Sequence, residues 1–91
     1  MPFVWDEEKE TRNVAKHKIS FAEAITVFDD ALFVIAADDD HSLLEKRFII
    51  LGESSRGRVL VVGYAERGKD TRIINARKAT PKERKNYEEE I

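Results

Sequence analysis

The residues best suited to chemistry in this chain are basic side chains in its last third. Between positions 67 and 85 there are eight basic residues and two acidic ones, a net charge of +6 in a chain whose total net charge is −2. The basic residues are Arg67, Lys69, Arg72, Arg77, Lys78, Lys82, Arg84 and Lys85. Arginine suits phosphate recognition because its planar guanidinium group matches two phosphate oxygens at once. The segment is therefore typical of a surface that binds phosphate groups.

The charge is also divided unequally between the two halves of the chain. Residues 1–45 carry a net charge of −7, and residues 46–91 carry a net charge of +5. An acidic half and a basic half indicate a polar molecule with one face suited to phosphate. A chance distribution of charge over a solvated surface would look the same, so composition alone leaves both interpretations open.

Four candidate side chains have both a structural and a chemical interpretation. Arg72 and Arg77 lie in a strand-like segment, where a buried arginine is costly without a partner. Each of them therefore faces water, pairs with a carboxylate or binds a phosphate. His17 follows a predicted helix, so it either caps the helix end or carries a proton. Tyr87 is a candidate proton donor or a packing residue, and packing is favoured.

The sequence lacks the signatures of several common sites. It contains no P-loop, no Ser-His-Asp order, no HExxH motif and no paired-carboxylate motif. Without cysteine it can form neither a disulfide nor a thiolate metal site. The run Asp38-Asp39-Asp40-His41 favours a solvated loop, because consecutive residues do not easily converge on one cation. We therefore expect no metal and no cofactor.

Length and hydropathy favour a single cytoplasmic domain. A chain of 91 residues is expected to form one domain, residues 1–91. No apolar run approaches about 18 residues, so no membrane-spanning helix is expected. The first six residues lack the basic end followed by an apolar stretch that marks a signal peptide. The default location is the cytoplasm.

Two helices are predicted ahead of the strands. The first runs from Glu7 to Lys16, with Asp6 as its cap and acidic residues in its first turn. One side of it carries polar residues at helical spacing, which is typical of a solvated face: Lys9, Arg12, Asn13 and Lys16. The second begins after Ser20, which forms a capping-box pattern with Glu23. Its apolar residues recur at core spacing: Phe21, Ala24, Ile25 and Phe28.

Four strands and a last helix complete the predicted fold. Strand-like segments cover residues 32–37, 46–51, 58–65 and 71–79, and the short turns between them indicate an antiparallel meander. The run Thr80-Pro81-Lys82-Glu83 then starts a C-terminal helix. The prediction is an α+β fold with two N-terminal helices, a four-stranded antiparallel sheet and a C-terminal helix, with a further short edge strand possible at residues 3–5.

Simple alternation divides the last strand into two faces. One would carry Arg72, Ile74, Ala76 and Lys78, and the other Ile73, Asn75, Arg77 and Ala79. Each face has apolar and basic groups, so the pattern does not decide which face is exposed to solvent.

Spaced blocks along the chain resemble the signature of the BrnT toxin family. The opening block matches at Trp5, Asp6, Lys9, Asn13, Lys16, His17 and Phe21. Later blocks match at Glu45, Arg47, Gly52, Gly57, Arg58, Arg72, Ile73, Ile74, Ala76, Arg77, Lys78, Ala79, Glu83, Arg84 and Tyr87. The resemblance spans residues 3–89. Two positions depart from it: Lys18 stands where glycine is usual, and Asn75 stands where serine is usual.

The resemblance implies a fold, an activity and a partner. The fold would be RelE-like, and the protein would be a ribonuclease toxin of a type II toxin–antitoxin pair. Its partner would be a small DNA-binding antitoxin of the ribbon-helix-helix type, bound in a hetero-oligomer. That complex would repress its own operon, so the toxin would meet operator DNA only through the antitoxin.

Charge type and resemblance together suggest roles for the candidate residues. A ribose 2′-hydroxyl would attack the adjacent phosphate without a metal, while basic side chains stabilise the negative charge that builds on it. Arg77 and Arg72 are assigned to that stabilisation, and His17 to proton transfer, with Tyr87 as the weaker alternative. The expected contacts to the RNA substrate are Lys16, Arg47, Lys78 and Tyr87. Two other interpretations stay open: a non-catalytic module that binds RNA or the ribosome, and a repressor-complex subunit.

Overall fold

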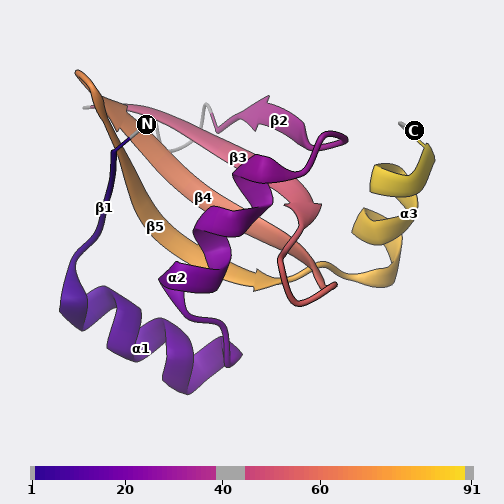
Figure 1. The fold of residues 1–91 in the computed structure, drawn as a ribbon, viewed down its shortest axis with the longest axis horizontal. Helices are drawn as coiled ribbons and strands as arrows, with labels where there is room; N and C mark the ends of the chain where they lie inside the picture. Colours follow the sequence, from indigo (N-terminus) through magenta and orange to yellow (C-terminus); the bar gives the residue numbers. More distant parts are fainter. Residues whose placement is uncertain (1, 39–44, 90–91) are drawn as a thin grey trace.

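The computed structural model describes residues 2–38 and 45–89, and these form helices packed on a sheet (Figure 1). The elements are β1 (Phe3–Val4), α1 (Glu7–His17), α2 (Phe21–Ala24), the 3₁₀ helix η1 (Ile25–Asp29), β2 (Val34–Ala37), β3 (Lys46–Glu53), β4 (Val59–Arg67), β5 (Asp70–Lys78) and α3 (Pro81–Glu89). Most of the predicted acidic loop, from Asp39 to His41, lies outside the described residues.

The described strands form a five-stranded mixed sheet in the order β1-β5-β4-β3-β2. Strands β2 to β5 are an antiparallel meander, as predicted. The possible edge strand at residues 3–5 is present as β1, which pairs parallel to β5 with Phe3 opposite Thr71 and Val4 opposite Arg72. The sheet therefore has five strands and is mixed, whereas four antiparallel strands were predicted. A two-residue strand carries too little alternation to reveal its partner or direction. The α+β class is confirmed.

The second predicted helix breaks after one turn. α2 ends at Ala24, and the chain continues as the 3₁₀ helix η1. Ile25, Thr26 and Val27 are β-branched and poorly suited to an α-helix, and the Thr26 hydroxyl donates to the Glu23 carbonyl oxygen at 2.6 Å. The buried residues Phe21, Ala24 and Val27 accordingly recur every three positions. Sequence periodicity had placed Ile25 and Phe28 in this stripe, and both are only partly buried against the core.

The core lies between α2, η1 and one face of the sheet (Figure 1). The strands supply its buried residues Ile50, Leu60, Val62, Tyr64, Ile73 and Ala76. Aromatic rings close one end, where Phe28 meets Tyr64 edge-on with ring centroids 5.1 Å apart. This packing holds β5 against the core, which matters because β5 carries several of the candidate site residues.

A β-bulge in β5 overturns the simple alternation expected along that strand. Gly63 lies opposite Asn75, but the next residue, Tyr64, lies opposite Ile73, so Ile74 is an extra residue. As a result both Ile73 and Ala76 face the core although they are three positions apart. Beyond the bulge every side chain changes face relative to an unbroken strand.

The bulge places Arg72 and Arg77 on the same outer face of the sheet. Arg72 lies opposite Ala65, and Arg77 lies opposite Val61. Residues directly opposite each other share a face, and positions 61 and 65 of β4 are an even number apart. Alternation had predicted opposite faces for the two arginines, because their separation of five is odd.

Each of the three helices begins at the cap that its sequence predicts. Asp6 accepts from the backbone N–H groups of Glu8 and Lys9 at 2.8 and 3.2 Å. Thr80 and Glu83 form a full capping box, with distances of 3.2 and 2.9 Å for its two hydrogen bonds. Ser20 accepts from the Glu23 N–H at 3.0 Å.

The capping box predicted at Ser20 is only half formed. The Glu23 carboxylate is buried and accepts instead from the Ser54 hydroxyl at 2.7 Å and from the Arg58 guanidinium. The Arg58 hydrogen bond is the main cause of the lowered pKa of Glu23. Glu23 therefore ties α2 to the β3–β4 turn, which a local pattern cannot reveal.

Replacing the Ser20 cap should destabilise the protein measurably. Ser20→Ala is expected to lower the free energy of unfolding by about 1 kcal/mol, because one N–H at the start of α2 loses its acceptor. Urea denaturation measures the change, and Ser55→Ala serves as a matched control on an exposed turn. Equal stability of the two variants would contradict the capping role of Ser20.

Candidate functional site

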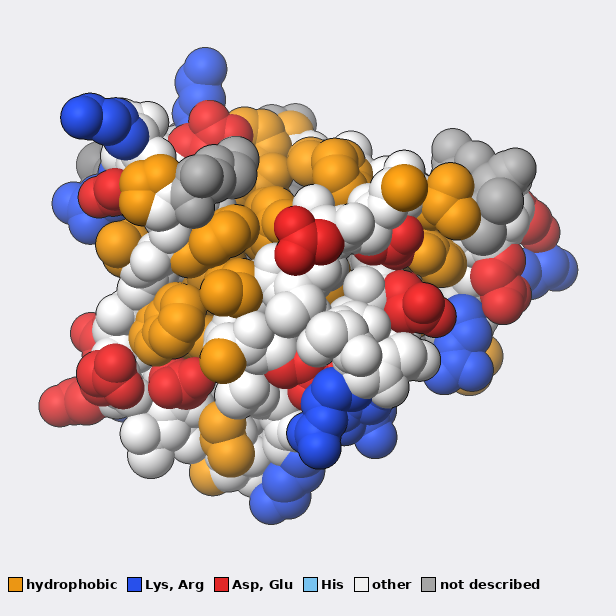
Figure 2. All heavy atoms as spheres, viewed as in Figure 1, with side chains coloured by type: hydrophobic (Ala, Val, Ile, Leu, Met, Phe, Trp, Pro, Cys, Tyr) orange, Lys and Arg blue, Asp and Glu red, His pale blue; other side chains and the backbone are white. Residues whose placement is uncertain are grey.

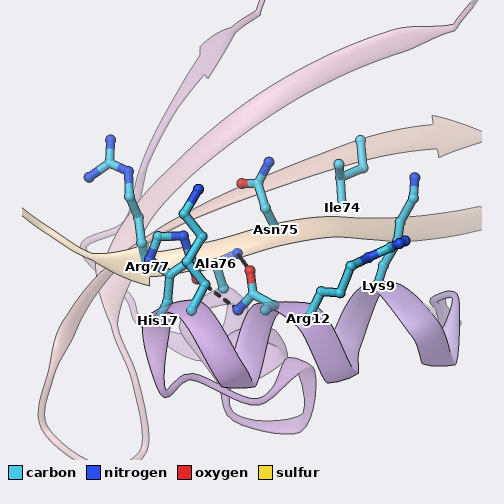
Figure 3. A pocket seen from close by; sticks show the side chains of 9 residues that line it. Lys9, Arg12, His17, Ile74, Asn75, Ala76 and Arg77 are labelled. Atoms are coloured by element: carbon cyan, nitrogen blue, oxygen red, sulfur yellow. Dashed lines mark hydrogen bonds between the residues drawn. The ribbon is translucent and has the colours of Figure 1, made fainter.

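A basic groove lies between α1 and β5. Its volume is about 550 Å³, and its lining is Lys9, Arg12, Asn13, Lys16, His17, Ile74, Asn75, Ala76 and Arg77. Five of these side chains are basic, and no carboxylate is among the lining residues. Figure 3 shows Lys9, Arg12 and His17 rising from α1 beside the Ile74, Asn75 and Arg77 side chains of β5. We call this surface the basic groove.

The basic groove depends on the orientation of α1, which turns its polar side toward the sheet. Lys9, Arg12, Asn13 and Lys16 recur at helical spacing, so they lie along one side of the helix. The acidic residues of α1 occupy its first turn, while Lys16 and His17 occupy its last. Figure 2 shows acidic side chains clustered where α1 begins and basic ones beyond its end. This order agrees with the helix dipole.

Asn13 holds α1 against the edge of β5. Its amide nitrogen donates to the Ala76 and Ile19 carbonyl oxygens at 2.8 and 2.9 Å, and its amide oxygen accepts from the Ala76 N–H at 3.0 Å. The side chain thus satisfies both backbone groups of Ala76, as another strand would. Asn13 is buried, so losing it would leave buried polar groups unpaired, at roughly 1–3 kcal/mol each.

Lys18 ends α1 in a left-handed conformation. Its φ is 62°, and its N–H donates to the Val14 carbonyl oxygen at 2.9 Å. Glycine is the usual residue at such a helix end because it has no Cβ to clash. This geometry explains why the sequence resemblance predicts glycine at position 18, and it shows that lysine preserves the turn.

The structure brings together only some of the predicted site residues. Lys16, His17 and Arg77 line the basic groove. So do Lys9 and Arg12, which sequence reasoning had assigned to a solvated face. The signal that could have found them is their helical spacing with Lys16, combined with the phosphate-binding interpretation of the second half. The predicted residues outside the lining are Arg47, Arg72, Lys78 and Tyr87.

Arg72 and Arg47 belong to a second basic cluster around Glu45. Arg72 donates to the Glu45 carboxylate, and the Arg47 and Arg67 guanidinium groups approach it at 3.6 and 3.8 Å. Three arginines thus surround this one carboxylate. Lys78 lies elsewhere, in a cavity that it lines with Arg58 and Arg84.

Arg77 is oriented by Glu83 at the start of α3. The two side chains form a bidentate pair with N–O distances of 2.7 and 2.9 Å. The Arg77 guanidinium lowers the pKa of Glu83 to about 2, and the same hydrogen bonds raise the pKa of Arg77. About two fifths of the Arg77 side chain is still exposed (39%), so it can contact a ligand while it is held.

Tyr87 anchors the other end of α3. Its ring is buried, and its hydroxyl donates to Asp30, which also accepts from the backbone N–H groups of Leu32 and Glu53. Burial and the bond to Asp30 raise the pKa of Tyr87 to about 12. The structure therefore places Tyr87 at a packing position away from the groove lining.

Within 2–38 and 45–89, no three histidine, cysteine, aspartate or glutamate side chains are grouped so that they could hold a metal ion. In the same part of the chain, no helix is long and apolar enough to cross a membrane.

Comparison with known proteins identifies one family. Residues 5–83 match the model of the ribonuclease toxin BrnT of type II toxin–antitoxin systems. The crystal structure of the Brucella abortus ribonuclease toxin BrnT superposes with a TM-score of 0.68 and 23% sequence identity, covering 88% of this chain and 97% of that one. This likeness confirms the fold. No curated protein sequence matches significantly.

The ion pair between Arg77 and Glu83 should make stability depend on pH. The pKa of Glu83 is depressed from 4.5 to about 2, so its contribution is complete above pH 4.5 and is lost as the pH falls toward 2. Glu83→Gln should therefore be less stable than wild type at neutral pH, by an amount that shrinks over this window. Solvent screening keeps the difference small.

Denaturation curves measured between pH 2 and pH 7 test this expectation. The matched control is the same Glu83→Gln change made in an Arg77→Ala background, where the guanidinium is absent and the pH-dependent difference should shrink to the part that the Thr80 hydrogen bonds cause. A difference between Glu83→Gln and wild type that stays constant with pH would contradict the pairing.

Proposed function

This chain belongs to the BrnT family of ribonuclease toxins from type II toxin–antitoxin systems, and we propose that it cleaves RNA in the basic groove. The observation that carries the proposal is the composition of that groove, where five basic side chains, one of them an imidazole, converge without a lining carboxylate. Such a surface attracts the phosphate backbone of a nucleic acid strand.

The proposed reaction uses the substrate's own hydroxyl group. The ribose 2′-oxygen attacks the adjacent phosphorus, and the bond from phosphorus to the 5′-oxygen of the next nucleotide breaks. His17 accepts the proton of the 2′-hydroxyl, and the departing 5′-oxygen takes a proton from water. Arg77 stabilises the negative charge that develops on the phosphoryl oxygens, in the orientation that Glu83 gives it.

Other basic residues would hold the strand on either side of the reacting phosphate. Lys9, Arg12 and Lys16 line α1's side of the groove and suit the phosphates there. Arg72 and Arg47 lie on the outer face of the sheet and would contact phosphates beyond the groove. Lys78 would contact the RNA strand outside the groove. Tyr87 would contribute indirectly, by holding α3 in its position.

We propose that this chemistry needs no metal ion. The basic side chains of the groove already carry the positive charge that a divalent metal ion would otherwise supply, and they repel such an ion. The nucleophile is present on the substrate, so no metal-bound water is required. RNA has the 2′-hydroxyl and DNA lacks it, so the mechanism restricts cleavage to RNA.

The partner is an antitoxin, as the family implies. We propose that it is a small DNA-binding protein of the ribbon-helix-helix type, that it forms a hetero-oligomer with this chain, and that operator DNA is bound through it. Acidic groups of the antitoxin would cover the basic groove, which would speed association and make it sensitive to salt. We propose that the toxin acts in the cytoplasm, where it would meet this substrate and this partner.

Purified protein incubated with synthetic RNA tests the reaction. Cleavage should continue in excess EDTA, and it should stop when the sugar at the cut site is 2′-deoxy. Loss of cleavage in EDTA would contradict the metal-independent mechanism, and cutting of the deoxy strand would contradict attack by the 2′-hydroxyl. RNA that is bound but never cut would contradict the enzymatic assignment and favour a binding module.

Variants assign the roles within the groove. Arg77→Ala should reduce the cleavage rate by about 10²–10³-fold, because it removes a group that acts on the transition state. His17→Ala should reduce it comparably if His17 transfers the proton. Arg56→Ala is the matched control, since Arg56 is exposed on the β3–β4 turn. Melting curves show whether each variant is folded, and a folded Arg77→Ala protein with full activity would remove Arg77 from the mechanism.

A further inference from the structure

A small cavity adjoins the basic groove on the outer face of the sheet. Its volume is about 160 Å³, and its lining is Asp38, Arg47, Phe48, Gly63, Tyr64, Ile74 and Asn75. It shares Ile74 and Asn75 with the basic groove, so the two spaces meet at these residues. The groove has room for a stretch of nucleic acid backbone, whereas the small cavity has room for little more than one ring system.

The β-bulge in β5 presents Asn75 at the junction of the two spaces. Ile74 is the extra residue of the bulge, and Asn75 follows it opposite Gly63. Bulges commonly redirect side chains beside functional sites. In Figure 3 the Asn75 and Ile74 side chains stand next to each other above β5.

Gly63 leaves the space that the Asn75 side chain occupies. A Cβ atom at position 63 would lie 2.8 Å from the Asn75 amide oxygen, closer than such atoms approach. The carboxamide therefore rests over the glycine. This close approach is a packing reason for glycine at a position in the middle of a strand, where glycine is otherwise unfavourable.

The Asn75 carboxamide has its hydrogen-bonding capacity available. The residue is exposed, and in the part of the chain that the structure describes no protein group hydrogen-bonds to its side chain. A carboxamide offers donors and an acceptor side by side, which is the arrangement that asparagine uses to bind the edge of a nucleobase.

Another wall of the small cavity also suits a base. Arg47 contributes a guanidinium group. Proteins that bind single-stranded RNA place unstacked bases against guanidinium planes as well as aromatic rings. The Phe48 and Tyr64 rings do not take this part, because they stack on the core side of the sheet, where Phe28 packs on Tyr64.

We propose that the small cavity is a nucleobase subsite in which Asn75 reads the base beside the cleaved phosphate. This inference rests on the proposed function, because it assumes an RNA strand in the basic groove. On the edge that carries N6 and N7, adenine alone presents a ring nitrogen acceptor beside an amino donor, and asparagine characteristically pairs with this edge. The proposed cut site therefore contains an unpaired adenine at one fixed position.

The test compares four short RNAs that differ only in the base next to a single cut site. Wild-type protein should cleave the adenine strand about tenfold or more faster than the other three strands. Asn75→Ala should reduce that ratio to about one, and Asn75→Ser should retain part of it. Asn86→Ala, a change of the same kind on the exposed side of α3, should leave the ratio unchanged. Melting curves confirm that each variant is folded.

Binding of the same four sequences as 2′-O-methyl RNA provides a readout that does not need cleavage. If wild-type protein cuts RNA without base preference, or if Asn75→Ala keeps the preference, the subsite is overturned and the proposed function stands. If wild-type protein cuts no RNA, the proposed function fails, and the binding preference and its loss in Asn75→Ala still decide the subsite. A preference for any other base would overturn the assignment to adenine.

Discussion

The pairing of the Asn13 amide with both backbone groups of Ala76 is the contact on which the candidate site depends. Within α1, Asn13 is the one buried residue, and Val14 is 40% exposed, so this helix has little apolar surface with which to pack. The Asn13 amide, which hydrogen-bonds to the edge of β5, takes the place of a hydrophobic interface between α1 and the sheet. The polar side of α1 can then face the sheet, which brings Lys9, Arg12 and Lys16 to the basic groove.

Two other features determine which charges that surface presents. The bulge at Ile74 places Arg72 and Arg77 on one face of the sheet, so that two basic clusters lie along the same side. Glu83 and Glu45 then each orient arginines without lining the groove, and the groove keeps its positive charge. Carboxylates that hold arginines by hydrogen bonds restrict the conformations of these long side chains. Less side-chain conformational entropy is then lost when a phosphate binds.

The sequence predicted those parts of the fold that local patterns control. The caps at Asp6, Ser20 and Thr80, the first helix and the four meander strands follow from signals within a few residues of one another. The parallel pairing of β1, the 3₁₀ continuation of α2 and the bulge in β5 depend on tertiary packing, and no local pattern reveals them.

The candidate site likewise combines residues that the sequence predicted with residues whose position depends on tertiary contacts. Charge composition predicted a phosphate-binding surface, and charge type together with the family resemblance selected Lys16, His17 and Arg77, which the structure brings to one groove. Neither signal predicted that Lys9 and Arg12 would join them. The side of α1 that faces the sheet is determined by the hydrogen bonds of Asn13 to Ala76. Glu23 was taken for a capping partner, whereas it binds Arg58, 35 residues away in the sequence. Contacts at that separation leave no periodic signal.

The central claim is that RNA occupies the basic groove between α1 and β5. Amide chemical-shift mapping of ¹⁵N-labelled protein with a short 2′-O-methyl RNA tests this most directly. This RNA has no free 2′-hydroxyl, so it can bind without being cleaved. The account predicts shift changes concentrated at residues 9–17 and 74–77, which weaken as salt is raised. Changes confined to α3 or to the α2 side of the sheet, with those residues unaffected, would contradict it.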